Sequence, residues 1–359
     1  MNVVSVVVPD WIDDPARISG GSRYDRRIAD ELRATGWAVV EIAAAGSWPR
    51  PETEALRALA EALDALPRDA LVVVDGLIAS AAGPVLLPRS DRLRLVVLVH
   101  MVFGGDAVAE ADERAVLAAA RTVVTTSTWS RRQLLDRYAL SPARVHVVRP
   151  GTEPAPAGVG TADGGRLLSV GTVAPHKGQD LLLEALAEVA DLPWRCTVVG
   201  ALDRDPHFVA ALQRRGREAG MADRVRYAGV LTGPELQLEH RRADVLVVPS
   251  RTETYGMVVT EALAAGRPVI AAAVGGVPEA LGRTSLGVPG LLVAPSDARA
   301  LAEALARWLT DADLRARLAR AALHRRESLP DWPTAGQRLR TVLARVPAEP
   351  ERLRLRVPR

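Results

Sequence analysis

The sequence is poor in the residues that build disulfides, metal clusters and membrane spans. It has one cysteine, Cys196, among 359 residues, so neither an intramolecular disulfide nor a cysteine-based metal site can form. The apolar run around Cys196 predicts a buried, unreactive thiol. No stretch reaches the roughly 18 consecutive apolar residues of a membrane-spanning helix, and the first residues lack the basic start and apolar length of a signal peptide. We therefore expect a cytoplasmic protein.

A strong excess of charge of either sign is also missing. The 46 lysines and arginines and the 43 acidic residues give a formal net charge of +3. Residues 1–310 hold 34 basic and 37 acidic side chains, which leaves no surplus of cations for phosphates and argues against a nucleic-acid partner. Residues 311–359 hold 12 arginines and 6 acidic residues. We interpret the basic tail as a solvated segment that permits peripheral contact with the inner face of a membrane.

Lysine occurs once, as Lys177, and the other 45 basic residues are arginine. An ammonium is a compact point charge with three rotatable donors, whereas a guanidinium is a planar fork. A position that keeps lysine in an arginine-rich chain is a candidate functional site. Whether Lys177 has a function is judged from the residues around it.

Apolar, β-branched runs alternate with helical segments along the first half of the chain. Val3–Val8 is continuously apolar, as expected for a parallel strand covered on both faces. A helix is predicted over Tyr24–Ala34, with Ser22 as its cap. Further strands are predicted at Ala38–Ile42, Leu71–Val74, Leu95–Val99, Thr122–Thr125 and Val145–Val148, and further helices at Glu52–Leu66, Ala107–Ala120 and Ser130–Tyr138. This alternation predicts an α/β fold with a doubly wound parallel sheet.

The same alternation restarts after a stretch rich in proline, glycine and alanine. We predict an N-terminal domain over 1–150, a linker over 151–163 and a C-terminal domain over 164–328. Strands are predicted there at Leu167–Val170, Cys196–Val199, Val225–Tyr227, Val245–Val248, Val269–Ala272 and Leu291–Val293, and helices at Asp180–Val189, His207–Ala219, Pro234–His240, Val258–Ala265, Ala298–Leu309 and Leu314–His324. Residues 329–359 are predicted to hold a helix near Thr334–Leu343 that crosses back onto the first domain, followed by the basic tail.

Two glutamates flank the start of a predicted helix in the second half. Glu253 falls in the polar loop after Val245–Val248, and Glu261 follows about two turns later. In an open parallel sheet, ligands bind beyond the carboxyl ends of the strands, where helix N-termini attract anions. Eight helical residues separate two side chains by up to about 12 Å along the axis. This spacing suits two contacts along one elongated ligand better than a single metal ion.

Lys177 lies in a similar turn, between a predicted strand and a predicted helix. Gly171 and Gly178 flank it within the segment Ser169–Asp180. A glycine-rich turn with an ammonium beside it makes an anion site, most plausibly for phosphate. The spacing is not that of a Walker A loop, and no dinucleotide fingerprint opens the chain.

These segments resemble the retaining glycosyltransferases of family 4. Glu253 and Glu261 match that family's pair of glutamates separated by seven residues, within a close match over Pro249–Ile270 that continues through Val274–Glu279. Gly171 with Lys177-Gly178 resembles the family's second glycine element. Weaker likenesses are found at Ser19–Gly21, Val99-His100, Thr126–Arg131, Tyr227–Val230 and Ala243–Val245.

The resemblance implies the GT-B architecture, in which two Rossmann-like domains enclose an interdomain cleft. It implies a metal-independent hexosyltransferase without a cofactor. The donor would be a UDP- or GDP-hexose, and the acceptor a small molecule, a glycan or a lipid-linked hydroxyl. We expect first-domain loops such as Gly76–Ser90 and Gly104–Ala109 to select the acceptor.

The resemblance also implies residue roles. Lys177 would contact the donor diphosphate, Glu253 the sugar hydroxyls and Glu261 the ribose hydroxyls, while His100 would face the transferred sugar. The implied catalytic residues are Lys177, Glu253 and His100; the donor-binding residues are Gly171, Thr172, Lys177, Glu253, Thr254, Tyr255, Gly256, Met257 and Glu261; and Gly20 and Gly21 form an acceptor or diphosphate loop.

One departure from the family pattern concerns the phosphate clamp. Many members have arginine directly after the glycine, where this chain has Thr172, and an alternative pattern has arginine where this chain has His176. The clamp therefore has one permanent cation, to which His176 adds a second only when protonated.

Other interpretations remain open. The two carboxylates could serve only to solvate helix ends, His100 could be a satisfied, partly buried imidazole, and Gly20-Gly21 could be a flexible turn. A nucleotide-sugar-binding module without turnover is the main alternative to an enzyme. A phosphorylase or epimerase is disfavoured, because the chain has no lysine besides Lys177 for pyridoxal phosphate.

Overall fold

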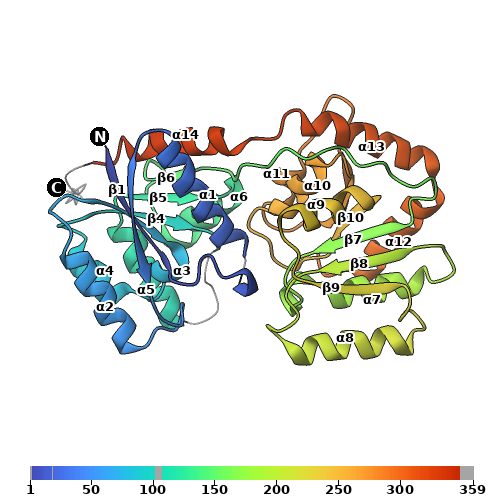
Figure 1. The fold of residues 1–359 in the computed structure, drawn as a ribbon, viewed down its shortest axis with the longest axis horizontal. Coiled ribbons are helices and arrows are strands. Elements are labelled where there is room, and N and C mark those ends of the chain that lie inside the picture. The colour runs from blue at the N-terminus through green and yellow to red at the C-terminus, as the bar shows by residue number, and fades with distance from the viewer. Residues whose placement is uncertain (1, 18, 102–106, 348–359) are drawn as a thin grey trace, which may run out of the picture. The chain divides into compact units, whose positions relative to one another are not determined.

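The computed structural model describes residues 2–17, 19–101 and 107–347. The chain divides into two compact units (Figure 1). The first unit comprises residues 1–150 together with 332–359, and the second comprises residues 151–331. The basic end of the tail, residues 348–359, lies outside the described residues.

The first unit is built on a six-stranded parallel sheet in the order β2-β1-β3-β4-β5-β6. Its strands are β1 (Val3–Pro9), β2 (Ala38–Ala44), β3 (Leu71–Asp75), β4 (Arg94–Val99), β5 (Thr122–Thr125) and β6 (Val145–Val147). The central strands β3, β4 and β5 are almost wholly buried. Their continuous apolar runs are the reason that the sequence predicts them well.

The longer helices of the first unit are α1 (Gly20–Ala34), α2 (Thr53–Asp64), α5 (Ala107–Ala119), α6 (Thr128–Tyr138) and α14 (Trp332–Leu343). The prediction that Ser22 caps the first helix is wrong. Ser19 is the cap and accepts from Ser22 N at 3.1 Å, while Ser22 Oγ accepts from Ser19 N at 2.9 Å. This reciprocal capping box draws Gly20 and Gly21 into the first turn of α1, so they do not form a flexible turn.

The segment Gly76–Ser90 is also not an open loop. It folds into α3 (Gly76–Ala79), α4 (Gly83–Leu86) and a 3₁₀ turn (Leu87–Arg89), and apolar side chains such as Ile78 and Leu86 bury its inner face. Elements this short carry no periodicity that a sequence could reveal. Residues 104–106 of the other predicted acceptor loop, Gly104–Ala109, lie outside the described residues, and its last three residues begin a helix.

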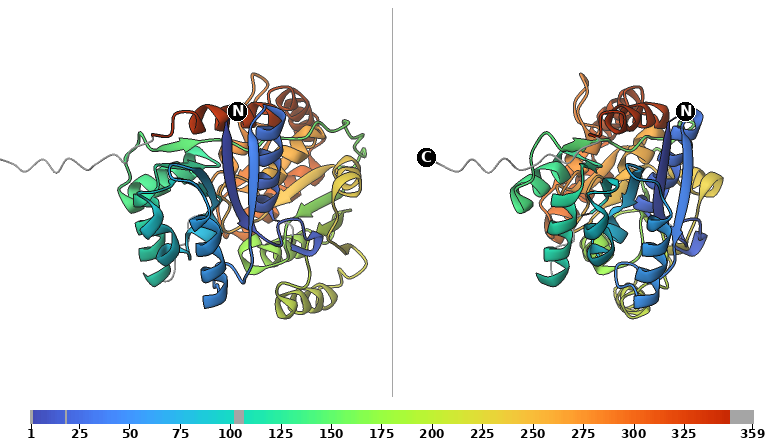
Figure 2. Two further views of the ribbon diagram at one scale, coloured as in Figure 1. Left: turned by 60° about the vertical axis from the view of Figure 1, so that its left-hand side comes forward. Right: turned by 90° about the vertical axis from the view of Figure 1, so that its left-hand side faces the viewer.

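The last helix, α14, packs beside α1 in the first unit (Figure 1 and Figure 2). Trp332 is 1% exposed and meets the Tyr24 ring edge-on at a centroid distance of 6.0 Å. A Cβ on Gly336 would lie 2.4 Å from Cβ of Glu31, so glycine permits the two helices to approach closely. The chain thus returns to its first unit after completing the second.

The second unit contains a six-stranded parallel sheet in the order β12-β11-β10-β7-β8-β9. Its strands are β7 (Arg166–Val170), β8 (Arg195–Val199), β9 (Val225–Gly229), β10 (Val245–Val248), β11 (Val269–Ala272) and β12 (Gly290–Val293). Apolar side chains cover both faces, because Leu167 packs into one core cluster and Leu168 into the other.

The helices of the second unit are α7 (Gln179–Glu188), α8 (Pro206–Glu218), α9 (Gly233–Arg242), α10 (Met257–Ala264), α11 (Val277–Leu281), α12 (Ala298–Thr310) and α13 (Ala312–Arg326). The stretch predicted as a linker has no helix or strand, and Asp244 anchors it through Thr161 N at 2.6 Å. Within the described part of the chain, no helix has the length and apolar character needed to cross a membrane.

Candidate functional site

Lys177 and Glu253 come from loops that follow two neighbouring strands. Lys177 ends the 3₁₀ turn Pro175–Lys177 after β7, and Glu253 lies between β10 and α10. Because β7 and β10 are adjacent and parallel, their carboxyl ends lie at the same edge of the sheet. Lys177 Nζ donates to Glu253 Oε2 at 2.7 Å, with 24% of the lysine and 15% of the glutamate side chain exposed. The fold therefore joins two separate sequence motifs.

Two glycines allow these loops to pack tightly. Gly178 has a φ of +72°, and a Cβ there would lie 2.1 Å from the carbonyl oxygen of Pro249. Gly275 has a φ of +55°, and a Cβ there would lie 1.6 Å from the carbonyl oxygen of Glu253. Any other residue would be strained at a left-handed φ and would also meet backbone atoms. The loop that carries Glu253 is thus fixed from two sides.

The chain enters α10 through Gly256, which has a φ of +92° and precedes Met257, the first residue of the helix. Tyr255 is 3% exposed and anchors this turn in the core, whereas Thr254 is half-buried. The turn directs the N-terminus of α10 toward the edge of the sheet where Glu253 lies, and backbone N–H groups at a helix N-terminus can receive an anion.

Glu261 lies two turns along α10 and is not on an exposed face. Its side chain is 13% exposed, and its Oε2 lies 3.8 Å from Nε2 of His240 at the end of α9. His240 itself is 3% exposed. A carboxylate with this little solvent can hold a hydroxyl group more selectively than a solvated one, which weighs against a role limited to solvating the helix end.

The glycine turn after β7 is held by its neighbours. Gly171 N donates to the carbonyl of Val199 at 2.8 Å, and Gln179 Nε2 donates to the carbonyl of Thr172 at 3.1 Å. Burial and, after it, the adjacent Lys177 charge lower the pKa of His176. The second charge that the sequence allows at this position therefore stays proton-dependent and needs a more acidic pH than an ordinary histidine.

Arg251 is a basic residue of this edge that the motifs did not single out. Its guanidinium donates to both carboxylate oxygens of Asp180, at 2.7 and 2.8 Å, and to the carbonyl of Pro175 at 2.6 Å. Its backbone N donates to the carbonyl of His176 at 2.8 Å. Arg251 therefore braces the turn that carries Lys177, and Asp180 offsets its charge. The sequence signal that could have identified Arg251 is its place between Ser250 and Glu253, within the motif that carries the two glutamates.

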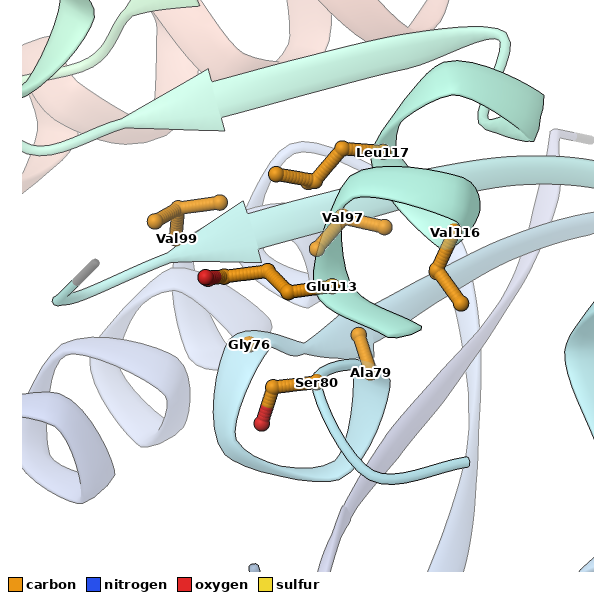
Figure 3. Close-up of a pocket in the computed structure, with 8 residues that line it drawn as sticks. All are labelled: Gly76, Ala79, Ser80, Val97, Val99, Glu113, Val116 and Leu117. Carbon is orange, nitrogen blue, oxygen red and sulfur yellow. The ribbon is translucent and has the colours of Figure 1, made fainter. Parts of the chain in front are cut away.

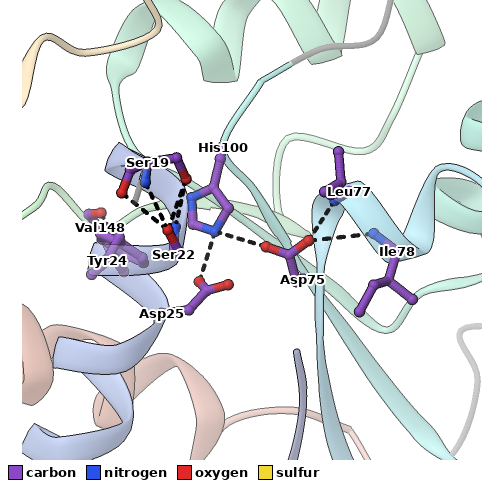
Figure 4. Close-up of polar contacts among 9 residues, drawn as sticks. All are labelled: Ser19, Ser22, Tyr24, Asp25, Asp75, Leu77, Ile78, His100 and Val148. Atoms are coloured by element: carbon purple, nitrogen blue, oxygen red, sulfur yellow. Dashed lines mark hydrogen bonds and ion pairs between the residues drawn. The ribbon is translucent and has the colours of Figure 1, made fainter. Parts of the chain in front are cut away.

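His100 belongs to the first unit, where it meets two buried carboxylates (Figure 4). It directly follows β4, Asp75 ends β3, and Asp25 projects from α1. His100 Nε2 lies 2.6 Å from Oδ1 of Asp25 and 3.4 Å from Oδ2 of Asp75. Gly21 lies beside the ring, because a Cβ there would come within 3.2 Å of two ring carbons.

Burial shifts the proton equilibria of this cluster. It raises the pKa of Asp25 to about 7, and burial together with the Asp25 charge raises the pKa of Asp75 well above its ordinary value. Burial lowers the pKa of His100, which favours the neutral imidazole. The sequence did not point to either aspartate. Asp75 was visible as an acid ending an apolar strand, and Asp25 as an acid on the apolar face of a helix.

Two recesses are lined by other residues than these. One, between α3 and α5, is lined by Glu113, Ser80 and apolar side chains and has no room for a water molecule (Figure 3). The other, of about 330 Å³, lies near the amino ends of β7 and β8 and includes Arg166 and Arg195. The candidate residues of the second unit occupy the opposite, carboxyl edge, where such sheets bind ligands.

Comparison with known proteins assigns the class. The model of the family described as glycosyl transferases group 1 matches residues 161–325. A D-inositol 3-phosphate glycosyltransferase 1 of Catenulispora acidiphila is 34% identical over 294 residues, which cover 75% of this chain and 68% of the relative. A D-inositol 3-phosphate glycosyltransferase of Frankia alni is 36% identical over 231 residues, which cover 59% of this chain and 56% of the relative.

Solved structures agree on the fold. Sucrose-phosphate synthase of Thermosynechococcus elongatus superposes with a TM-score of 0.79 at 24% identity, covering 96% of this chain and 98% of that chain. HepE of Anabaena, solved with UDP-glucose, superposes with a TM-score of 0.78 at 17% identity, covering 96% of this chain and 100% of that one. The chain belongs to the family 4, group 1 glycosyltransferases, has the GT-B fold, and is a glycosyltransferase.

Proposed function

We propose that the protein transfers a hexosyl group from a nucleoside-diphosphate sugar, UDP- or GDP-linked, to an acceptor hydroxyl with retention of anomeric configuration. The observation that carries this proposal is the 2.7 Å contact between Lys177 and Glu253 at the carboxyl edge of the second sheet. The contact supports the proposal, because an ammonium is a partner for a diphosphate and the carboxylate beside it accepts hydrogen bonds, as sugar hydroxyls require.

Lys177 is the residue that meets the developing negative charge. As the glycosidic C–O bond breaks, the electron pair passes to the diphosphate oxygen, and a fixed ammonium beside that oxygen lowers the barrier. The N-terminus of α10 adds partial positive charge from the same edge. No metal ion is required in this scheme, because the ammonium and the helix dipole supply the charge.

Glu253 and Glu261 hold hydroxyl groups rather than attack carbon. Glu253 already accepts from Lys177, and a carboxylate held in this way accepts further hydrogen bonds from sugar hydroxyls. Glu261, eight residues farther on, receives the ribose hydroxyls. The acceptor hydroxyl then attacks from the face that the diphosphate leaves, forms the new C–O bond and passes its proton to the departing phosphate. This route gives retention without a glycosyl-enzyme intermediate.

A panel of UDP-, GDP- and ADP-sugars in thermal-shift and calorimetric titrations tests the donor. The donor that binds is then incubated with acceptors, beginning with D-inositol 3-phosphate because curated relatives carry that name. NMR of the product reports the anomer, and assays with EDTA report metal dependence. An inverted product, or activity lost to EDTA and restored by Mg²⁺, would contradict the corresponding part of the proposal.

The second candidate is a nucleotide-sugar-binding module without turnover. Thr172 in place of arginine and the lowered pKa of His176 favour it, since they leave Lys177 as the one permanent cation of the glycine turn. Slow hydrolysis of the bound donor in the absence of acceptor, or transfer to any acceptor in the panel, excludes this candidate. Tight donor binding with neither reaction supports it.

A further inference from the structure

The strongest unassigned feature of the first unit is the arrangement behind His100. Two carboxylates from different elements converge on the same ring nitrogen, with Asp25 Oδ1 at 2.6 Å and Asp75 Oδ2 at 3.4 Å from Nε2 (Figure 4). The side chains of Asp25 and Asp75 are 1% and 6% exposed, whereas that of His100 is 14% exposed. Buried carboxylates are costly, and here both face a single imidazole nitrogen.

Asp75 is held in place independently of His100. Asp75 caps α3, because its Oδ1 accepts from Leu77 N at 2.7 Å and from Ile78 N at 3.3 Å. Its other oxygen is thereby turned toward the histidine. Asp25 lies on the buried face of α1, and its Oδ2 is buried without a hydrogen-bond partner among the described residues. The capping contacts therefore fix Asp75, and burial against the first unit confines Asp25 on the same side of the ring.

Tyr24 and Gly21 lie beside the His100 ring. The Tyr24 ring meets it edge-on at a centroid distance of 5.3 Å, and Tyr24 Oη donates to the carbonyl of Val148 at 3.0 Å. Gly21 leaves just enough room on another side. In Figure 4 the second ring nitrogen, Nδ1, points away from both carboxylates.

Proton accounting then selects one tautomer. Asp25 Oδ1 is the nearer oxygen, at 2.6 Å, and the pKa of Asp75 is raised further than that of Asp25, so Asp75 keeps its proton and Asp25 is the carboxyl that ionises. An ionised carboxylate oxygen only accepts, so Nε2 donates to Asp25 and carries the hydrogen. Since the neutral ring has one N–H, Nδ1 is left as an acceptor. The titratable and charged groups that act on the cluster are Asp25, Tyr24 and Arg26 on α1, Asp75 at the end of β3, and His100 itself. Arg26 is paired with Asp13 and Glu41.

We propose that Asp25 and Asp75 are positioning residues that hold His100 as its Nε2–H tautomer, so that Nδ1 accepts a hydrogen bond from a hydroxyl of the donor sugar or the acceptor. The choice of a hydroxyl ligand rests on the proposed function, but the tautomer does not. An imidazole that accepts at Nδ1 discriminates in favour of a hydroxyl and against groups that only accept.

The tautomer is measured directly by ¹⁵N NMR of the full-length protein with labelled histidine. The chain has six histidines, so the His100 signals are assigned by their loss in His100→Ala. We expect a protonated Nε2 and an unprotonated Nδ1 at neutral pH. In Asp25→Asn and Asp75→Asn, an amide that donates to Nε2 shifts the population toward the Nδ1–H form. Asp30→Asn, on the exposed face of the same helix, is the control and keeps the wild-type pattern.

Kinetics test whether the tautomer matters. We expect Asp25→Asn and Asp75→Asn to lower kcat by about 10–100-fold, as for partners of a reacting-site histidine, with a smaller change in KM for the donor. In a His100→Ala background, Asp25→Asn should have no further effect on kcat, because it acts through the ring. An independent structural role predicts instead that the two losses multiply.

The outcomes separate this proposal from the proposed function. A wild-type Nδ1–H tautomer overturns the positioning role even if transfer is observed. The expected tautomer in a protein that transfers no sugar supports the positioning role and rejects the proposed function. A stoichiometric metal ion that Asp25→Asn removes also overturns it, since the three ligand atoms lie within 4.8 Å of one another and an ion would then join them. If a variant fails to fold, the wild-type spectrum still decides the tautomer.

Discussion

Replacing Lys177 with alanine separates a role in the reaction from a role in folding. At 2.7 Å, the charges of Lys177 and Glu253 attract by about 6 kcal/mol at an effective dielectric constant of about 20. Desolvation and side-chain ordering offset most of this attraction, so partly exposed pairs add only about 0–1 kcal/mol to stability. We therefore expect the free energy of unfolding of Lys177→Ala to stay within about 1 kcal/mol of wild type.

The effect on the reaction should be far larger. The ammonium faces charge that develops only as the diphosphate leaves, and losing one such positioned group costs about 2.7–4 kcal/mol of barrier, or about 10²–10³ in kcat. Arginine at this position keeps the charge but spreads it over a planar fork, so Lys177→Arg should recover only part of the activity.

The assay compares initial rates of nucleoside-diphosphate release at saturating donor with urea unfolding of the same preparations. Arg299→Gln is the matched control, because Arg299 pairs with Glu303 in the same unit with side chains 89% and 66% exposed, and both measurements should stay at wild-type values. The reasoning fails if Lys177→Ala retains a rate within about three-fold of wild type, or if its rate falls only as far as its folded fraction.

Three further predictions concern packing and protonation. Gly178→Ala should lower the free energy of unfolding, measured with urea, by at least about 2 kcal/mol. Gly220 has a similar φ of +68° but no atom within 4 Å of a new Cβ, so Gly220→Ala should lose only the cost of placing alanine in a left-handed backbone conformation. Cys196 should react with a thiol reagent only after unfolding, because it is 1% exposed and burial raises its pKa to about 12; reaction in the native state contradicts its burial. The raised pKa of Asp25 means that the folded state binds its proton more tightly, so stability should fall as pH rises from about 4 to about 7, and less steeply in Asp25→Asn; equal slopes in pH-dependent unfolding refute this.

The sequence predicts the sheets better than the loops. Thr122–Thr125, Val245–Val248 and Val269–Ala272 have the predicted bounds, because a buried parallel strand is a continuous apolar run ended by polar or turn residues. The start of α1 and the helix α11 were missed, since glycine and proline at a helix N-terminus read as a turn. The first residues of such helices are set by capping contacts, which the periodicity of apolar residues in the sequence does not show.

The residues of the candidate site likewise fall into those that a local motif predicts and those that only the fold brings together. Lys177 was predicted from one short motif, and Glu253 and Glu261 from another. The contact between Lys177 and Glu253 arises because β7 and β10 are adjacent in the sheet but distant in the chain. Asp25 and Asp75 belong to no motif. Each stands out in its own segment only as an acid among apolar residues, and their common contact with His100 exists only because the fold brings α1, β3 and β4 together.

The glycines of the motifs that indicate the family are explained by how the loops pack rather than by what the loops bind. Gly178 fits against the carbonyl of Pro249, and Gly275 fits against the carbonyl of Glu253, so these glycines would be required even if the protein bound a ligand without turning it over. A match to the glycines alone therefore cannot separate an enzyme from a binding module. Lys177 can, because its contribution to stability is small and its contribution to leaving-group departure is large.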